Sequence, residues 1–366
     1  MFNLKEQFKE QIDDFTNPSG VWEVAEDIFQ RNQQYGKLLF EGAEAAVGQS
    51  PKDVVWSLNK VKLYRYRSPR PATVTVPLLM VYALINRAYI LDLVPGRSLI
   101  EYLVGRGFDV YLLDWGTPGL EDKDLTFGDY ITNYIPKAVK RIKRLSKAKE
   151  FSILGYCMGG TMSAMYAALY PDDGLKNLIL MASPIDFSFH PYYSVWLRNK
   201  NFDLDRMVDV LGLIPGNLID WGNKMLKPVQ NFLSSEVNLW SNALDDKFLQ
   251  SWAPVNKWVN DGPPFPGEVY RQWIRDFYQE NKLVKGEVRI SGHRVDLGKI
   301  KANLLAIGAT RDHITLPQQV KPALEYCGSV DKEYFEVDAG HVALTISSRA
   351  TKKTWPKIAE WLQSHC

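Results

Sequence analysis

The chain contains only three cysteines, Cys157, Cys327 and Cys366, among its 366 residues. So few thiols form no disulfide framework, which excludes small disulfide-stabilised secreted proteins and fits a reducing compartment. Long apolar runs are also missing, because the longest one, residues 78–85, is too short to span a bilayer. The first ten residues mix both charges and contain no signal-peptide core. We therefore expect a cytoplasmic protein that does not cross a membrane.

An excess of one charge is absent as well. The 44 basic and 42 acidic residues leave a formal net charge of +2, which argues against a general nucleic-acid-binding protein. The sequence has neither a glycine-rich phosphate loop nor cysteines and histidines at metal-ligand spacing, so we expect no bound cofactor and no metal. Its 46% apolar residues and its length suit one large domain with an insertion, or two domains.

Strand and helix patterns alternate through most of the chain. Residues 1–70 are polar with helix-like spacing of apolar residues, and we expect an N-terminal helical segment there. In residues 71–183 and 297–366, short apolar runs alternate with amphipathic stretches, which predicts a mostly parallel sheet covered by helices. Residues 184–296 interrupt this pattern and are rich in tryptophan, tyrosine and proline. We expect this insertion to form a cap, or lid, over the catalytic core.

One short motif stands out in the first alternating segment. Residues 155–160 read Gly-Tyr-Cys-Met-Gly-Gly and lie between an apolar run at 151–154 and a helix-prone stretch. A strand, a tight turn with one reactive residue and a helix are the context of a nucleophile elbow, where glycines permit the sharp turn. The reactive residue is Cys157, and the positive end of a helix dipole favours its thiolate. We expect Cys157 to be the nucleophile; a buried cysteine in a glycine-rich turn is the alternative.

Two further residues complete a catalytic set. Asp312 and His341 follow apolar strands predicted at residues 302–309 and 333–338. The chain order nucleophile, acid, base is that of the α/β-hydrolases, in which the acid orients the histidine and the histidine takes the proton of the nucleophile. His313 is a weaker candidate for the base, because it lies on the same loop as the acid.

An oxyanion hole is expected from two backbone amides. The amide after the nucleophile belongs to Met158. The second should follow the early strand at residues 74–82, which places it at Leu84 or Ile85 by position alone. The sequence therefore predicts an α/β-hydrolase fold with an inserted, aromatic-rich cap and a Cys-His-Asp triad.

Seven short stretches carry a combination of motifs, at residues 77–87, 109–116, 155–160, 277–283, 295–297, 312–314 and 340–341. Together they resemble the catalytic subunit of polyhydroxyalkanoate synthases of the short, two-component class III type. The resemblance runs from about residue 60 to the C-terminus. It places the family's catalytic residues on Cys157, Asp312 and His341.

The resemblance implies (R)-3-hydroxyacyl-CoA, chiefly 3-hydroxybutyryl-CoA, as substrate, and a polyhydroxyalkanoate made through a covalent Cys157 thioester with release of CoA. It also implies a second, non-catalytic synthase subunit and contact with the growing polyester on cytoplasmic granules. We further expect a homo-oligomer. The chemistry agrees, because exchange of a CoA thioester for a cysteine thioester is nearly balanced and leaves the acyl group activated for transfer.

Two other functions stay open at this point. A cysteine-dependent α/β-hydrolase, acting as a thioesterase or a polyester depolymerase, would use the same triad but pass the acyl group to water. A non-catalytic scaffold or granule-coating protein is the third reading. It is disfavoured because the whole catalytic set is present.

Overall fold

The computed structural model describes residues 18–41, 45–191, 193, 197, 202–227 and 234–366. The chain divides into two compact units. The smaller unit contains residues 1–45 and 227–257, and the larger one contains residues 46–226 and 258–366. All the residues predicted to form the site belong to the larger unit.

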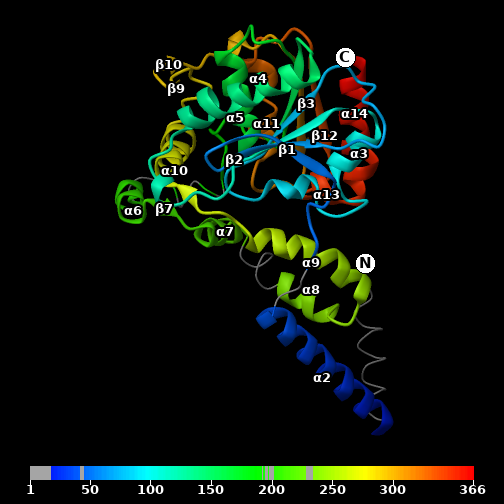
Figure 1. Cartoon of the computed structure of the whole chain (residues 1–366). Helices are drawn as coiled ribbons and strands as arrows, with labels where there is room; N and C mark the ends of the chain where they lie inside the picture. The colour runs from blue at the N-terminus through cyan, green and yellow to red at the C-terminus, as the bar shows by residue number, and fades with distance from the viewer. Residues whose placement is uncertain (1–17, 42–44, 192, 194–196, 198–201, 228–233) are drawn as a thin grey trace. The chain divides into compact units, whose positions relative to one another are not determined.

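An eight-stranded sheet forms the centre of the larger unit (Figure 1). Its strand order is β1-β2-β4-β3-β5-β6-β11-β12. All neighbours from β4 to β12 pair in parallel, whereas β2 is antiparallel to both β1 and β4. The strands are β1 (Lys52–Leu58), β2 (Val61–Tyr66), β3 (Leu78–Val81), β4 (Val110–Asp114), β5 (Phe151–Tyr156), β6 (Leu175–Met181), β11 (Asn303–Ala309) and β12 (Lys332–Val337). The prediction of a mostly parallel sheet is confirmed.

Helices cover both faces of this sheet, so its central strands are continuous apolar runs. Every residue of β3 and β5 is buried. On one face α3 packs against α14, and on the other lie α4 and α5 (Figure 1). The helices around the sheet are α3 (Leu99–Gly105), α4 (Ile135–Ser146), α5 (Met158–Leu169), α11 (Pro317–Val320), α12 (Ala323–Tyr326), α13 (Ala343–Ile346) and α14 (Trp355–Ser364). Because α5 is buried on all sides, the strand and helix that flank Cys157 are held rigidly.

A group of short elements between β6 and β11 forms what we call the cap. It consists of α6 (Leu204–Leu211), β7 (Leu213–Ile214), α7 (Gly216–Lys224), β8 (Phe265–Pro266), α10 (Gly267–Gln272) and a π-helix (Trp273–Gln279). β7 and β8 pair antiparallel, and Arg271 of α10 forms salt bridges with Asp205 and Asp209 of α6. The predicted cap of residues 184–296 extends further than this group, because residues 227–257 belong to the smaller unit.

The described residues of the smaller unit are mostly helical. It contains α2 (Pro18–Glu41), α8 (Ser235–Ser241) and most of α9 (Asp246–Asn260). Tyr35 of α2 donates a hydrogen bond to Glu236 over 2.8 Å, and the indole of Trp240 donates one to Asn32 over 2.8 Å, so that α2 is fastened to α8. In the described part of the chain, no helix combines the length and the apolar character that crossing a bilayer requires.

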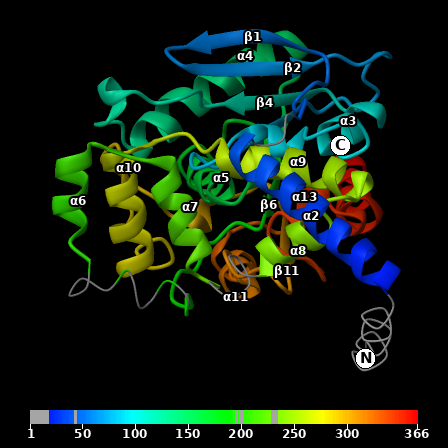
Figure 2. The ribbon, with the colours of Figure 1, turned by 90° about the horizontal axis from the view of Figure 1, so that it is seen from below.

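The prediction that residues 1–70 are helical agrees with α2 but is wrong from residue 52 onward. There the chain forms β1 and β2, which lie at one edge of the sheet (Figure 2). β1 is an edge strand, and none of its seven residues is buried, so its apolar alternation is weak. The turn that joins the two strands uses Asn59, at φ 52°, where a glycine would have been a stronger hairpin signal. Residues 1–17, which belong to the same prediction, lie outside the described residues.

Candidate active site

Cys157 lies at the turn between β5 and α5, where the sequence predicts a nucleophile. Its backbone adopts φ 56° and ψ −132°, a conformation that residues with a side chain rarely occupy. The amide of Cys157 donates a hydrogen bond to the carbonyl oxygen of Met181 over 2.9 Å, which fastens the turn to β6. The thiol is thereby held at the N-terminus of α5, beyond the carboxyl end of its strand, as in a nucleophile elbow.

Two glycines, Gly155 and Gly159, allow the elbow to pack without side chains in its way. A Cβ atom at Gly159 would collide with the carbonyl oxygen of Val81 and would lie 2.6 Å from the carbonyl carbon of Tyr82. A Cβ atom at Gly155 would lie 2.8 Å from the amide nitrogen of Gly160. The obstacles are backbone atoms of buried segments, which cannot rotate away as a side chain can. Glycine is therefore required at these positions for close approach.

We expect Gly159→Ala to lower the free energy of unfolding by about 1–3 kcal/mol, because the added methyl group overpacks the junction between α5 and β3. Urea denaturation measures this change. Gly105→Ala is the matched control, since a Cβ atom at Gly105 in α3 meets no atom within 4 Å. That variant should lose no stability. Equal stability of the two variants would contradict the steric role of Gly159.

Asp312 and His341 follow β11 and β12, which are neighbouring parallel strands. Because parallel strands end at the same edge of a sheet, the two side chains meet there, with Nδ1 of His341 2.6 Å from Oδ2 of Asp312. The other carboxylate oxygen, Oδ1, accepts hydrogen bonds from the amides of Ile314 and Thr315 over 2.8 and 2.9 Å. Both members of the pair are buried. The backbone thus fixes the carboxylate, and the carboxylate orients the imidazole.

The electrostatics of His341 link all three predicted triad residues. Burial by itself lowers the pKa of His341, since it disfavours the imidazolium. The charges of Asp312 and Cys157, and side-chain hydrogen bonds to both, outweigh burial and raise this pKa to about 10. The imidazole therefore contacts the acid on one side and the thiol on the other. This arrangement places a readily protonated imidazole beside the sulfur, as the base of a triad requires.

Tyr156, the residue before the nucleophile, supports the histidine in a way that the sequence does not reveal. Its hydroxyl donates a hydrogen bond to the carbonyl oxygen of His341 over 2.9 Å, and the two rings lie 5.2 Å apart. Tyr82 packs against Tyr156 with 5.5 Å between the ring centroids. Any residue can precede the cysteine in a Gly-x-Cys motif, so the motif does not predict this contact. Only the folded structure shows it.

Two of the residues predicted to supply oxyanion-hole amides, Met158 and Ile85, line the cavity that contains Cys157. Met158 is the first residue of α5, where helix amides have no partner within the helix. Ile85 lines the same cavity as Cys157 and Met158, while Leu84 is buried in the core. Of the two positions predicted after β3, only Ile85 lines the cavity, and the oxyanion hole itself stays a prediction.

Two indoles hold the loop that contains Ile85. The Nε1 atom of Trp115 donates a hydrogen bond to the carbonyl oxygen of Tyr82 over 2.8 Å. The Nε1 atom of Trp258 donates one to the carbonyl oxygen of Arg87, also over 2.8 Å. The loop is therefore fixed both before and after Ile85. Neither tryptophan lies in a motif that assigns it to the site, so the sequence analysis missed both.

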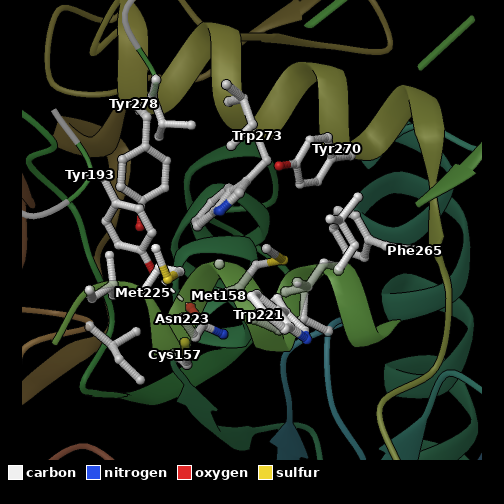
Figure 3. A pocket seen from close by; sticks show the side chains of 18 of the residues that line it. Cys157, Met158, Tyr193, Trp221, Asn223, Met225, Phe265, Tyr270, Trp273 and Tyr278 are labelled. Atoms are coloured by element: carbon white, nitrogen blue, oxygen red, sulfur yellow. Dashed lines mark hydrogen bonds between the residues drawn. The ribbon is translucent and has the colours of Figure 1, made fainter. Parts of the chain in front are cut away.

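A cavity of about 450 Å³ lies above Cys157 (Figure 3). The elbow and Ile85 contribute to its lining, and the cap supplies most of the remaining lining residues. Two cap residues of α7, Leu218 and Trp221, line the cavity and are 45% and 59% exposed, so it opens to solvent beside this helix. The labelled wall residues from the cap are Trp221, Asn223, Met225, Phe265, Tyr270, Trp273 and Tyr278, and most of the surface they offer is apolar.

Comparisons with known proteins agree with this geometry. Residues 76–345 match the family model of the alpha/beta hydrolase fold. Among solved structures, a soluble variant of the Saccharomyces cerevisiae monoglyceride lipase has a TM-score of 0.58 at 14% identity, and covers 88% of this chain and 97% of its own. The Paleococcus ferrophilus monoacylglycerol lipase has a TM-score of 0.53 at 19% identity, with 83% and 99% covered. The predicted α/β-hydrolase fold is confirmed.

The sequence comparisons define the family more narrowly. Residues 6–103 match the model "Poly-beta-hydroxybutyrate polymerase (PhaC) N-terminus". The poly(3-hydroxyalkanoate) polymerase subunit PhaC of Allochromatium vinosum is 37% identical over 92% of this chain and 96% of its own length. The corresponding subunits of Synechocystis sp. and Haloferax mediterranei are 37% and 38% identical, covering 86% and 93% of this chain and 85% and 69% of their own. The chain belongs to the poly(3-hydroxyalkanoate) polymerase family, which confirms the resemblance.

Proposed function

We propose that this chain polymerises (R)-3-hydroxyacyl-CoA, chiefly 3-hydroxybutyryl-CoA, into a polyhydroxyalkanoate with release of CoA. The observation that carries the proposal is the Cys157–His341–Asp312 arrangement, in which Cys157 lines a mostly apolar cavity. Membership in the polymerase family supports the substrate and the product. Cys157 acts as nucleophile, His341 as base and Asp312 as the residue that orients the base.

In the first step the Cys157 thiolate attacks the thioester carbonyl carbon of the substrate. A bond forms between this carbon and the cysteine sulfur, and the bond to the CoA sulfur breaks. His341, which holds the proton of the thiol, returns it to the departing CoA thiolate, so that CoA leaves as a free thiol. The amides of Met158 and Ile85 donate to the oxygen that becomes negatively charged between these events.

Elongation transfers the acyl group from sulfur to a hydroxyl. His341 takes the proton of the hydroxyl of one hydroxyacyl unit, and the resulting oxygen attacks the thioester carbon of another. An ester bond forms, the carbon–sulfur bond breaks, and the proton passes to the sulfur that leaves. A thioester lies above an ester in free energy, so a thiol nucleophile keeps this transfer favourable where a serine ester would leave little driving force. The steps need only acyl and proton transfer, and the proposal invokes no cofactor.

We also propose that the chain acts with a second, non-catalytic synthase subunit, as part of a homo-oligomer, and in contact with the growing polyester on cytoplasmic granules. Family membership supports this assignment. The smaller unit offers apolar side chains for such contacts, since Trp22 and Phe29 of α2 are 76% and 62% exposed.

Incubation of the purified full-length chain with (R)-3-hydroxybutyryl-CoA tests the proposed reaction, with and without the co-expressed second subunit. We expect free CoA thiol to be released together with an insoluble polyester, and the rate to be higher with the second subunit. Release of CoA with soluble 3-hydroxybutyrate in place of polymer would identify a thioesterase. Depolymerisation of added polyester, with no thiol released from the CoA substrate, would identify a depolymerase.

A further inference from the structure

The cavity above Cys157 carries a side-chain amide in a mostly apolar wall. Asn223 contributes it from the last turn of α7, and no other amide side chain lines the cavity among the described residues. The hydroxyl of Tyr193 donates a hydrogen bond to Oδ1 of Asn223 over 2.8 Å. With the oxygen engaged in this way, the amide nitrogen is directed away from Tyr193 (Figure 3). The hydrogen bond from Tyr193 fixes the amide, and Nδ2 makes no hydrogen bond with the described residues. Nδ2 is therefore a fixed donor that faces the cavity without a partner in the described part of the chain.

This donor shares its cavity with the nucleophile. Asn223 in the cap wall and Cys157 of the elbow line the same space, and both are labelled in Figure 3. Tyr193 is close enough to Cys157 for the charges of Cys157 and Asp312 to add to burial, the largest cause, in raising the pKa of its hydroxyl. Tyr193 therefore remains a protonated donor at neutral pH and continues to hold the oxygen of the amide.

A purely apolar cavity discriminates poorly between a hydroxyacyl group and the same acyl group without the hydroxyl. An apolar pocket binds both chains by their methylene groups, and a buried hydroxyl that lacks a partner is disfavoured. A donor built into the wall reverses this preference, because the amide loses its partner when the hydroxyl is missing.

We propose that Nδ2 of Asn223, held in place by Tyr193, donates a hydrogen bond to the 3-hydroxyl oxygen of the acyl group at Cys157. Asn223 thereby selects 3-hydroxyacyl substrates over plain acyl-CoA. The inference rests on the proposed function. It adds a specificity-determining residue and a positioning residue, Tyr193, that lie outside the triad and the oxyanion hole.

First-turnover thiol release, with enzyme in excess, compares (R)-3-hydroxybutyryl-CoA with butyryl-CoA. The native chain should acylate at least about tenfold faster with the hydroxylated substrate, the value of one hydrogen bond. In Asn223→Leu we expect this ratio to fall to about one, because the rate with (R)-3-hydroxybutyryl-CoA falls towards the rate with butyryl-CoA. Tyr193→Phe, which keeps the ring and the asparagine, should lower the ratio partially. Measurable acylation by butyryl-CoA in a variant shows that its elbow and triad are intact. A merely structural defect would instead lower the rates with both substrates and leave their ratio unchanged.

Tyr278→Phe distinguishes the amide from the neighbouring hydroxyl that lines the same cavity. It should leave the ratio as in the native chain. Three results would each overturn the inference. The ratio could be near one in the native chain, or it could be unchanged in Asn223→Leu. It could also be as low in Tyr278→Phe as in Asn223→Leu. If Asn223→Leu does not fold, an unchanged ratio in Tyr193→Phe overturns it. If the native chain releases CoA equally fast from both substrates, the role of Asn223 is refuted but the proposed function is not. If it releases no CoA from either substrate, the proposed function is refuted.

Discussion

Replacing Cys157 by alanine will abolish CoA release and polymer formation while the fold is retained. We expect a loss of at least about 10⁴-fold in rate, because no other side chain can take the place of the nucleophile in the elbow. The small side chain of alanine fits the same turn, so the melting temperature should change little. Thiol release from 3-hydroxybutyryl-CoA and recovery of insoluble polyester measure the outcome.

The two remaining cysteines provide controls for this variant. Cys327 is buried, and burial raises the pKa of its thiol to about 12, so it stays protonated at neutral pH. Cys366 is exposed and lies in no elbow. Cys327→Ala and Cys366→Ser should therefore release CoA at the native rate. Thiol release retained by Cys157→Ala would show that the acyl group does not pass through this sulfur.

The second large effect concerns Asp312→Asn, which should damage elongation more than acylation. The asparagine can still accept the hydrogen bonds from the amides of Ile314 and Thr315, but it no longer stabilises a protonated His341. A thiol is far more acidic than an alcohol, so attack by Cys157 depends less on the base than attack by a hydroxyl group does. We expect the polymerisation rate to fall about 10³–10⁴-fold. The loss in acylation rate should be smaller than this by a factor of at least about ten.

Rapid-quench acylation in a single turnover, compared with steady-state polymerisation, separates the two effects. His341→Gln serves as the reference variant, because loss of the base itself should reduce both rates together. Equal losses of acylation and elongation in Asp312→Asn would contradict the separate role assigned to the carboxylate.

Parts of the fold could be predicted because their signals are local or periodic. The buried strands β3, β4, β5 and β11 are short apolar runs bounded by turn residues, and α5 follows its strand directly. β1 and β2 escaped prediction because no residue of β1 and only three of the six residues of β2 are buried. The two strands pair antiparallel at the edge of the sheet, where the apolar pattern is least regular. Their place next to β4 is a long-range contact that no local pattern reports.

The sequence by itself determined the identity and order of Cys157, Asp312 and His341. Each follows a strand of one parallel sheet, and parallel strands bring the residues at their carboxyl ends to one edge whatever the intervening chain does. Only the tertiary structure decided which side chains surround the thiol. Tyr193 and Asn223 of the insertion, and the indoles of Trp115 and Trp258, act through contacts between distant segments. Such contacts depend on how the cap and the loops pack in three dimensions. Residues that meet in this way are not regularly spaced in the sequence, so no sequence pattern predicts them.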